Sequence, residues 1–216
     1  MKQYLNEQER RRLDQRVSDA EKRTGAQIVL AVVERSDSYA ELPWKAFALG
    51  TAVAGLAITA LDLLRPGWHA PTAVLVAVTA TLIAGAACAL ACVGLPGFAR
   101  LFLDVHRAEV EARQYAESLF LSREVFATRG RTGILLLVSL FEREIIMLPD
   151  TGLSKRLGRE ASHRIITGMT MPLASGQVAK ALEEGLAGLE EILTATAPAV
   201  AAENELPNGI VEEKGS

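Results

Sequence analysis

The side chains best placed to do chemistry are carboxylates that follow predicted strands. Glu34 and Asp37 come after the apolar run QIVLAVV, and Asp150 comes after EIIMLP. In a layered α/β domain, ligands bind beyond the carboxyl ends of strands, and oxygen-rich loops suit a hard cation such as Ca²⁺. Asp150 and Asp37 are therefore the candidate metal ligands. A competing interpretation is that Asp150, Thr151 and Gly152 form only a turn and a helix cap.

Other patterns associated with catalysis are missing from the sequence. The glycines of TRGRTGILLLV precede a strand, whereas dinucleotide and P-loop motifs join a strand to a helix. No serine lies in a G-x-S-x-G elbow, and His69, His106 and His163 share no metal-ligand spacing. Cys88 and Cys92 lie in an apolar run without further metal ligands, so we expect them to pack as small apolar side chains. We assign no catalytic residue, which favours a protein without enzymatic activity.

Two long apolar segments occupy the middle of the chain. Residues 72–95 contain no charged side chain, although 23% of the chain is charged. Residues 42–68 have an uncharged centre between Lys45 and Asp62, which can lie at the two membrane interfaces. Since about twenty apolar residues in a helix cross a bilayer, residues 41–99 are predicted to form a transmembrane helical hairpin that turns at residues 65–68. The alternative is a pair of buried core helices.

The charges around these segments predict their orientation. The connector carries only Arg65, whereas the outer flanks carry several basic residues: Arg35, Lys45, Arg100, Arg107 and Arg113. Positive flanks stay in the cytoplasm, and residues 1–12 lack the apolar core of a secretory signal. We therefore expect a multi-pass protein of the bacterial inner membrane, with both termini cytoplasmic and the lipid bilayer as a partner. Scattered basic residues and a formal net charge of -3 argue against nucleic acid binding.

The remaining segments predict one α/β domain that the hairpin interrupts. Asn6 and Glu9 fit a capping box at the start of a helix over about 7–23, and residues 27–33 form a strand that is apolar on both faces. Further elements follow the hairpin: a helix from Val105 to Leu119, strands over 134–140 and 144–149 joined by a tight turn, and helices over about 153–169 and 182–193 that Pro172 separates. The expected fold class is α/β, a small three-layer α/β/α domain with the transmembrane helical hairpin inserted in a βα crossover.

These patterns also predict where the parts of the chain begin and end. Residues 1–40 and 100–196 are expected to form the two parts of the α/β domain, on either side of the hairpin at residues 41–99. Residues 197–216 are rich in Glu, Asn, Pro and Gly, so we expect a flexible acidic tail there.

Several stretches together resemble the TPM domain family, in its bacterial membrane-hairpin branch. They are AEKRTGAQIVLAV, SDSYAELPW, GRTGILLLVSLFEREIIMLPDTGL, RIITGM with GQVAKALEEGLAGLEEIL, and NELPNGIVEE. The resemblance extends over nearly the whole chain. The resemblance implies a three-layer α/β/α fold. The positions that match the family's markers are Thr24, Gly25, Arg131, Thr132, Gly133, Glu142, Arg143, Asp150 and Gly152. Gln27 stands where many relatives have Glu, and His163 stands where a Trp is common.

The roles that this resemblance implies are diverse. They include a phosphatase activity attributed to plastid members, photosystem repair, receptor assistance and calcium binding. Our leading hypothesis is a membrane-anchored, cytoplasmic-facing binding or assembly domain that is non-enzymatic and supports membrane protein complexes, with a membrane-protein partner. The alternatives are a divalent-cation (Ca²⁺) binding module and, by family analogy alone, a weak phosphatase. The missing carboxylate at Gln27 weakens any metal or acid–base role near the first strand.

Overall fold

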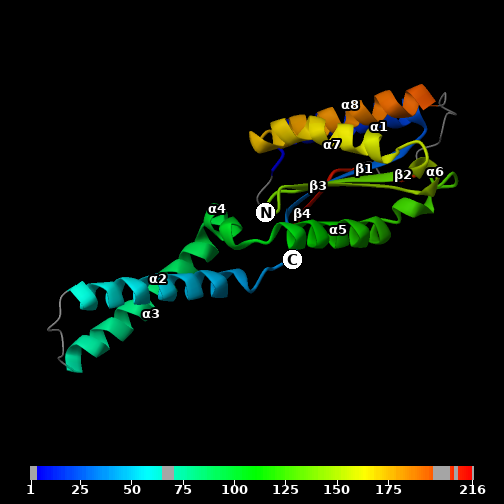
Figure 1. Ribbon diagram of the computed structural model, residues 1–216. Helices are drawn as coiled ribbons and strands as arrows, with labels where there is room; N and C mark the ends of the chain where they lie inside the picture. Colours follow the sequence, from blue (N-terminus) through cyan, green and yellow to red (C-terminus); the bar gives the residue numbers. More distant parts are fainter. Residues whose placement is uncertain (1–3, 65–70, 197–204, 207–208, 216) are drawn as a thin grey trace. The chain divides into compact units, whose positions relative to one another are not determined.

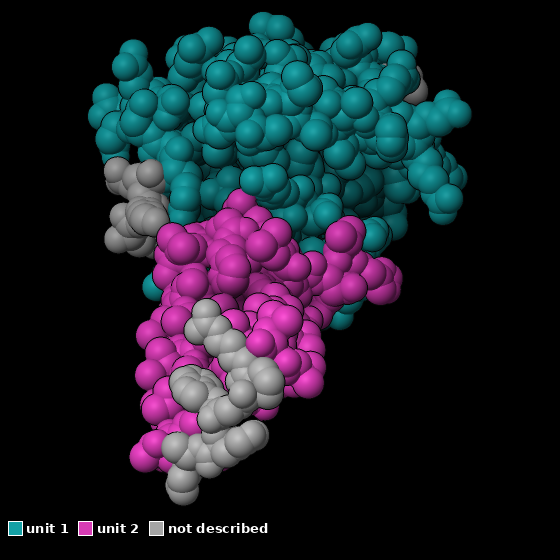
Figure 2. Space-filling model, turned by 60° about the vertical axis from the view of Figure 1, so that its left-hand side comes forward, with its two compact units in different colours: residues 1–37, 108–216 teal, residues 38–107 magenta. Residues whose placement is uncertain are grey.

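A computed structural model describes residues 4–64, 71–196, 205–206 and 209–215 of the chain (Figure 1). The chain divides into two compact units, which Figure 2 distinguishes by colour. The larger unit comprises residues 1–37 and 108–216, and the smaller unit comprises residues 38–107. The predicted turn at residues 65–68 and His69 lie outside the described residues.

The larger unit is built on a four-stranded sheet in the order β3-β2-β1-β4. Its strands are β1 (Gln27–Arg35), β2 (Gly133–Ser139), β3 (Glu144–Pro149) and β4 (Val211–Gly215). β1 pairs in parallel with β2 on one side and with β4 on the other. β3 returns antiparallel to β2, which confirms the two strands and the tight turn predicted between them.

Helices cover both faces of this sheet (Figure 1). Three helices lie over one face, α1 (Glu7–Thr24), α7 (Arg159–Ala174) and α8 (Val178–Thr196), and α5 (Val105–Ser122) lies over the other. Alternate residues of β1 enter two separate cores, with Ile28 and Leu30 in one and Val29 and Ala31 in the other. The strand is apolar on both faces because both faces are covered. The predicted three-layer α/β/α fold is confirmed.

Local sequence signals explain how these helices start and stop. The Asn6 side chain accepts a hydrogen bond from the Glu9 N–H at 2.7 Å, and the Glu9 carboxylate accepts one from the Asn6 N–H, so the predicted capping box is present. The single helix expected over 153–169 is instead two helices, α6 (Thr151–Ser154) and α7, because Gly158 interrupts the helix and precedes α7. Pro172 does not end α7, which continues to Ala174 before Gly176 turns the chain with a φ of 74°.

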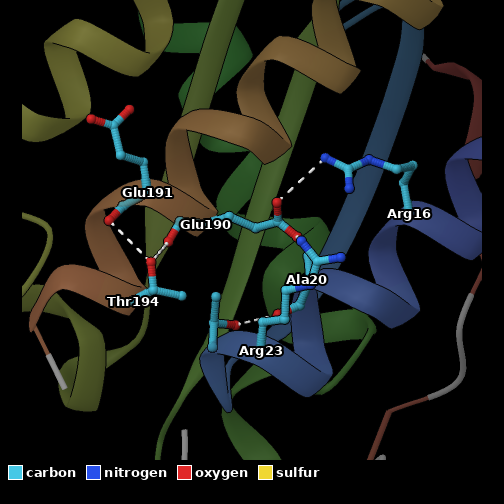
Figure 3. Close-up of polar contacts among 7 residues, drawn as sticks. Arg16, Ala20, Arg23, Glu190, Glu191 and Thr194 are labelled. Carbon is cyan, nitrogen blue, oxygen red and sulfur yellow. Dashed lines mark hydrogen bonds and ion pairs between the residues drawn. The ribbon is translucent and has the colours of Figure 1, made fainter. Parts of the chain in front are cut away.

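Helices α1 and α8 are joined by charged as well as apolar contacts, and Figure 3 shows the charged ones. The Glu190 carboxylate of α8 lies 3.3 Å from the Arg16 guanidinium and 3.9 Å from that of Arg23, both on α1. Partly exposed ion pairs of this kind contribute about 0–1 kcal/mol each. The fully buried leucines of α8 therefore provide most of the packing energy: Leu182, Leu186, Leu189 and Leu193.

Strand β4 corrects the expectation of a flexible tail. Residues 211–215 lie in the sheet, with Val211 opposite Ala31 of β1. The acidic composition of this segment hid the strand, but Glu212 and Glu213 point to opposite faces of the sheet, where each finds a cation. Glu212 pairs with Arg10, and Glu213 accepts a hydrogen bond from Arg123 at 3.0 Å.

Further contacts hold the segment that leads into β4. The side-chain oxygen of Gln27, at the start of β1, accepts hydrogen bonds from the backbone N–H groups of Glu205 and Leu206 at 3.0 and 3.1 Å. Leu206 and Ile210 are buried. The amide oxygen of Gln27 thus holds this segment through two backbone N–H groups. The family resemblance implies a carboxylate at this position in many relatives.

The smaller unit contains the two apolar helices, α2 (Leu42–Leu64) and α3 (Pro71–Gly94), followed by α4 (Pro96–Ala99) and the 3-10 turn η1 (Arg100–Phe102). α2 and α3 are long and apolar enough to cross a membrane, and only 6% and 11% of their most apolar stretches are buried. They pack closely on each other, since a Cβ added to Gly85 would lie 2.9 Å from a ring carbon of Phe47. Helices so exposed do not fit the alternative of buried core helices.

Candidate functional site

The sheet carries the candidate residues to two opposite ends instead of one. At the amino ends of β1 and β2 lie most of the family-marker positions: Thr24, Gly25, Arg131, Thr132, Gly133, Asp150 and Gly152. At the carboxyl ends lie the other candidates: Glu34, Asp37, Glu142 and Arg143.

Asp37 and Asp150 do not converge, which corrects the prediction of a shared metal site. The Asp150 N–H donates to the carbonyl of Gly133 at 2.8 Å, at the start of β2. Asp37 follows the far end of β1, and the paired strands run in parallel from Gln27 to Val33 between these points. At about 3.3 Å per residue, the two carboxylates are separated by roughly 20 Å. The prediction assumed that β3 ends at the same edge as β1, whereas β3 runs the opposite way.

Thr24 and Gly25 form the passage from α1 into β1. Gly25 has a φ of 69°, and its N–H donates to the carbonyl of Glu21 at 2.8 Å. The Thr24 hydroxyl donates to the carbonyl of Ala20 and accepts from the N–H of Ala26. A left-handed residue that closes a helix is usually glycine, so this Thr-Gly pair has a structural role.

Arg131 and Asp150 form an ion pair at this end of the sheet. Arg131 Nε lies 2.9 Å from Asp150 Oδ2, as an ion pair without the geometry of a directed hydrogen bond. The Asp150 side chain is only 4% exposed, whereas that of Arg131 is 50% exposed. Asp150 Oδ1 accepts from the Thr151 N–H at 2.7 Å, which confirms the cap interpretation. The arginine already neutralises the carboxylate that was a candidate calcium ligand.

Two glycines allow the segments around this ion pair to approach one another. A Cβ on Gly152 would lie 2.6 Å from the carbonyl oxygen of Arg131. The same oxygen accepts a hydrogen bond from the Gly152 N–H at 2.9 Å. A Cβ on Gly133 would overlap the carbonyl oxygen of Val125, in the 3-10 turn η2 (Val125–Ala127). The Arg-Thr-Gly and Asp-Thr-Gly sequences are therefore two halves of one closely packed structure.

At the opposite end of the sheet, Glu142 organises a buried polar cluster. Its carboxylate accepts a hydrogen bond from the Ser36 N–H at 2.8 Å and another from the Ser139 hydroxyl. The Ser36 and Ser139 hydroxyl oxygens lie 2.8 Å apart, and all three side chains are buried. Glu142 thus ties the β2–β3 turn to the end of β1, while Arg143 completes the turn with a φ of 61°. The sequence offered no signal for Ser36 or Ser139, because their partners are distant along the chain.

The chemistry available to these groups is limited by their enclosure. A serine beside a carboxylate can act as a nucleophile only if substrate reaches the hydroxyl, and Ser139 is fully buried. Among the described residues, no three His, Cys, Asp or Glu side chains gather into a possible metal site. Among the family-marker positions, Arg131, Arg143 and Gly152 are exposed. The guanidinium of Arg131 also lies 5.8 Å from the ring centre of Phe126.

Residues 102–192 match the family model described as the TPM domain. This part of the chain belongs to the TPM domain family. The match spans α5, β2, β3 and most of the helices that follow, and it includes Arg131, Glu142 and Asp150. The resemblance was expected over nearly the whole chain, but the family model begins after the apolar helices. α1 and β1 precede these helices and complete the sheet of the TPM domain.

A solved structure shares the fold. It is the NMR structure of the BA42 protein from the psychrophilic bacterium Bizionia argentinensis, with 13% sequence identity and a TM-score of 0.60. The similarity covers 98% of this chain and 97% of that chain. At this level of identity the similarity shows the fold alone. No curated protein matches the chain.

Glu21, on the last turns of α1, is a buried acid that the sequence patterns did not single out. Its carboxylate accepts a hydrogen bond from the Ile28 N–H at 2.9 Å. Burial raises the pKa of Glu21 above its ordinary value of 4.5, although this hydrogen bond acts in the opposite direction. Because the pKa is higher in the folded state, protonated Glu21 stabilises the fold at acid pH. This stabilisation is lost as the pH rises through the folded-state pKa.

We predict that Glu21→Gln raises the thermal stability of the protein at neutral pH. The glutamine oxygen can still accept the Ile28 N–H but carries no buried charge. Thermal unfolding from about pH 4 to about pH 8 should show a melting-temperature difference between variant and parent that widens as the pH rises. The control is Glu7→Gln, at an exposed position of the same helix. A difference that stays constant across this pH range would contradict the prediction.

Proposed function

We propose that this chain is a membrane-anchored TPM-domain protein that faces the cytoplasm and binds a membrane-protein partner without catalysing a reaction. The hairpin is the observation that carries the proposal. α2 and α3 are long, apolar and almost unburied, and they interrupt the domain between β1 and α5. Since the two helices form a hairpin (Figure 1), their outer ends emerge together. A chain that enters and leaves a bilayer on the same side allows both parts of the domain to fold together there.

The charges at the outer ends of the hairpin support the cytoplasmic orientation. Lys45 lies in the first turns of α2, and Arg100 and Arg107 follow α3. Basic residues at this position keep the segments that carry them on the cytoplasmic side during insertion. We therefore infer an inner-membrane protein with both parts of the domain in the cytoplasm.

The amino end of the sheet is the favoured binding surface. Arg131 is half exposed, and the buried Asp150 carboxylate beneath it fixes the position of its guanidinium. Arg129, two residues away, is also exposed. An arginine held in one orientation loses little entropy when it contacts a carboxylate or carbonyl on a partner. The enclosed Ser139 and Glu142 at the other end favour binding over hydrolysis.

Site-specific photo-cross-linking in native membranes tests this proposal. A photoreactive amino acid at Arg129 should cross-link to a discrete membrane protein, and the product should disappear when Arg131→Glu is added. The matched control places the same group at Thr170, an exposed position on α7, where we expect no such product. Carbonate washing of the membranes should leave the protein in the pellet.

Several outcomes would replace this proposal with another. Release of the protein by carbonate would contradict the proposed membrane anchor. The absence of a cross-link from Arg129 in a folded protein would contradict the proposed membrane-protein partner. A phosphomonoesterase activity that follows the protein through purification would favour the phosphatase alternative. A saturable Ca²⁺-dependent rise in melting temperature, lost in Asp150→Asn, would favour the cation-binding module.

A further inference from the structure

The chain changes direction where the second apolar helix ends. α3 ends at Gly94, Leu95 is extended, and Pro96 begins the short helix α4, which η1 follows. Lys45 Nζ, in the first turns of α2, donates a hydrogen bond to the carbonyl of Phe102 at 3.3 Å. A straight continuation of α3 would carry Phe102 about 12 Å past Gly94, beyond the reach of Lys45. Residues 95–102 therefore fold back to the level of the outer ends of both apolar helices.

Apolar side chains point outward from this region. We call residues 95–105 the elbow segment. Leu101 and Val105 are 76% and 78% exposed, Leu95 is 59% exposed, and Trp44 of the adjoining first turn of α2 is 72% exposed. So many large exposed apolar groups in a short stretch mark a surface that something covers.

Basic groups accompany these apolar side chains. Lys45 is exposed beside Trp44, and Arg100 lies in the elbow segment itself. A tryptophan next to a lysine at the end of an apolar helix is typical of the membrane interface, where the ring lies among headgroups and the ammonium reaches phosphates. The same combination of an apolar surface with basic residues is found in segments that lie in the plane of the interface.

We propose that the elbow segment lies in the headgroup layer of the leaflet that contains the outer ends of the hairpin. Leu95, Leu101 and Val105 insert at the boundary of the acyl chains, and Lys45 and Arg100 face the lipid phosphates. Direct continuity with α3 and the Lys45–Phe102 hydrogen bond place the segment at this depth, which favours lipid over a protein as the covering group. The inference rests on the proposed membrane anchor and adds to it an in-plane contact with the bilayer.

Depth-dependent quenching of a fluorescent label tests this contact in the full chain. Cys88 and Cys92 are replaced with alanine, and a single cysteine at Leu101 carries an environment-sensitive dye. The protein is reconstituted into vesicles of phosphatidylcholine and phosphatidylglycerol. We expect strong loss of fluorescence with nitroxides on lipid headgroups, weaker loss with nitroxides deep in the acyl chains, and little loss with aqueous iodide.

Labels at two control positions distinguish a failure of this inference from a failure of the proposed membrane anchor. A label at Val78, exposed in the middle of α3, should be quenched by deep nitroxides, and one at Leu121, exposed on α5, should be quenched by iodide. If the Leu101 label behaves like the Leu121 label while Val78 is quenched by lipid, the elbow inference is wrong and the anchor stands. A Leu101 label shielded from iodide and from all nitroxides also overturns the inference, because a protein surface then covers it. If Val78 is not quenched by lipid, the anchor itself fails, and the inference fails with it.

Discussion

Gly133→Ala is expected to cost about 3 kcal/mol or more of folding free energy. The added Cβ would overlap the carbonyl oxygen of Val125 and lie 2.8 Å from a methyl group of its side chain. A backbone carbonyl cannot rotate away as a flexible side chain can, so either η2 or the start of β2 must move. That movement would also disturb the adjoining Arg131–Asp150 ion pair.

Denaturant unfolding of the full chain in mild detergent measures this cost. The control is Gly168→Ala on α7, where no atom lies within 4 Å of the added Cβ. There we expect a gain of about 0.5–1 kcal/mol, because alanine restricts the unfolded chain and favours a helix. If Gly133→Ala unfolds at the same denaturant concentration as the parent, η2 does not pack against β2 as described.

Glu142→Ala is expected to destabilise the protein by about 3 kcal/mol, because it leaves two buried donors without an acceptor at about 1–3 kcal/mol each. These donors are the Ser36 N–H and the Ser139 hydroxyl. The link between the β2–β3 turn and the end of β1 would be lost with them. Thermal and denaturant unfolding should both report the loss.

Two companion variants show whether the hydrogen bonds are the cause. Arg143→Gly changes the next residue of the turn, which is exposed and has a φ of 61°. It should leave the stability unchanged or raise it by up to about 1 kcal/mol, since glycine adopts this conformation without strain. Glu142→Gln should fall between the parent and Glu142→Ala, because an amide has one oxygen acceptor where the carboxylate has two. An alanine variant as stable as the parent would show that water replaces the carboxylate.

Much of the fold was predictable because its signals are local. Asn6 and Glu9 mark the start of α1 through contacts within one helical turn, and the doubly apolar β1 requires helices on both faces of the sheet. The apolar helices were predictable from length and composition. Each of these features depends on residues close together in the sequence.

The errors arose where distant pairing decides the structure. The sequence predicts that Asp37 and Asp150 converge because it does not state the direction in which β2 pairs with β1. Since β2 is parallel to β1 and β3 is antiparallel to β2, β3 ends at the opposite edge of the sheet from β1. The acidic sequence of β4 predicts a tail because the partners of its glutamates, Arg10 and Arg123, lie far away in the chain. Ser36 and Ser139 carry no motif, and their importance comes from the single carboxylate that they share.

Because β1 lies between β2 and β4 in the sheet, the order of synthesis determines when the sheet can be completed. β1 is made before the hairpin, yet both strands that flank it, β2 and β4, are made after the hairpin. A ribosome therefore releases an apolar strand with two open edges well before its neighbours exist, and in the proposed membrane-anchored protein the hairpin enters the bilayer during that interval. The domain can close only when the segment that begins at Glu205 reaches Gln27. A nascent chain arrested before that point exposes an aggregation-prone edge, which would mark it for chaperones or proteases.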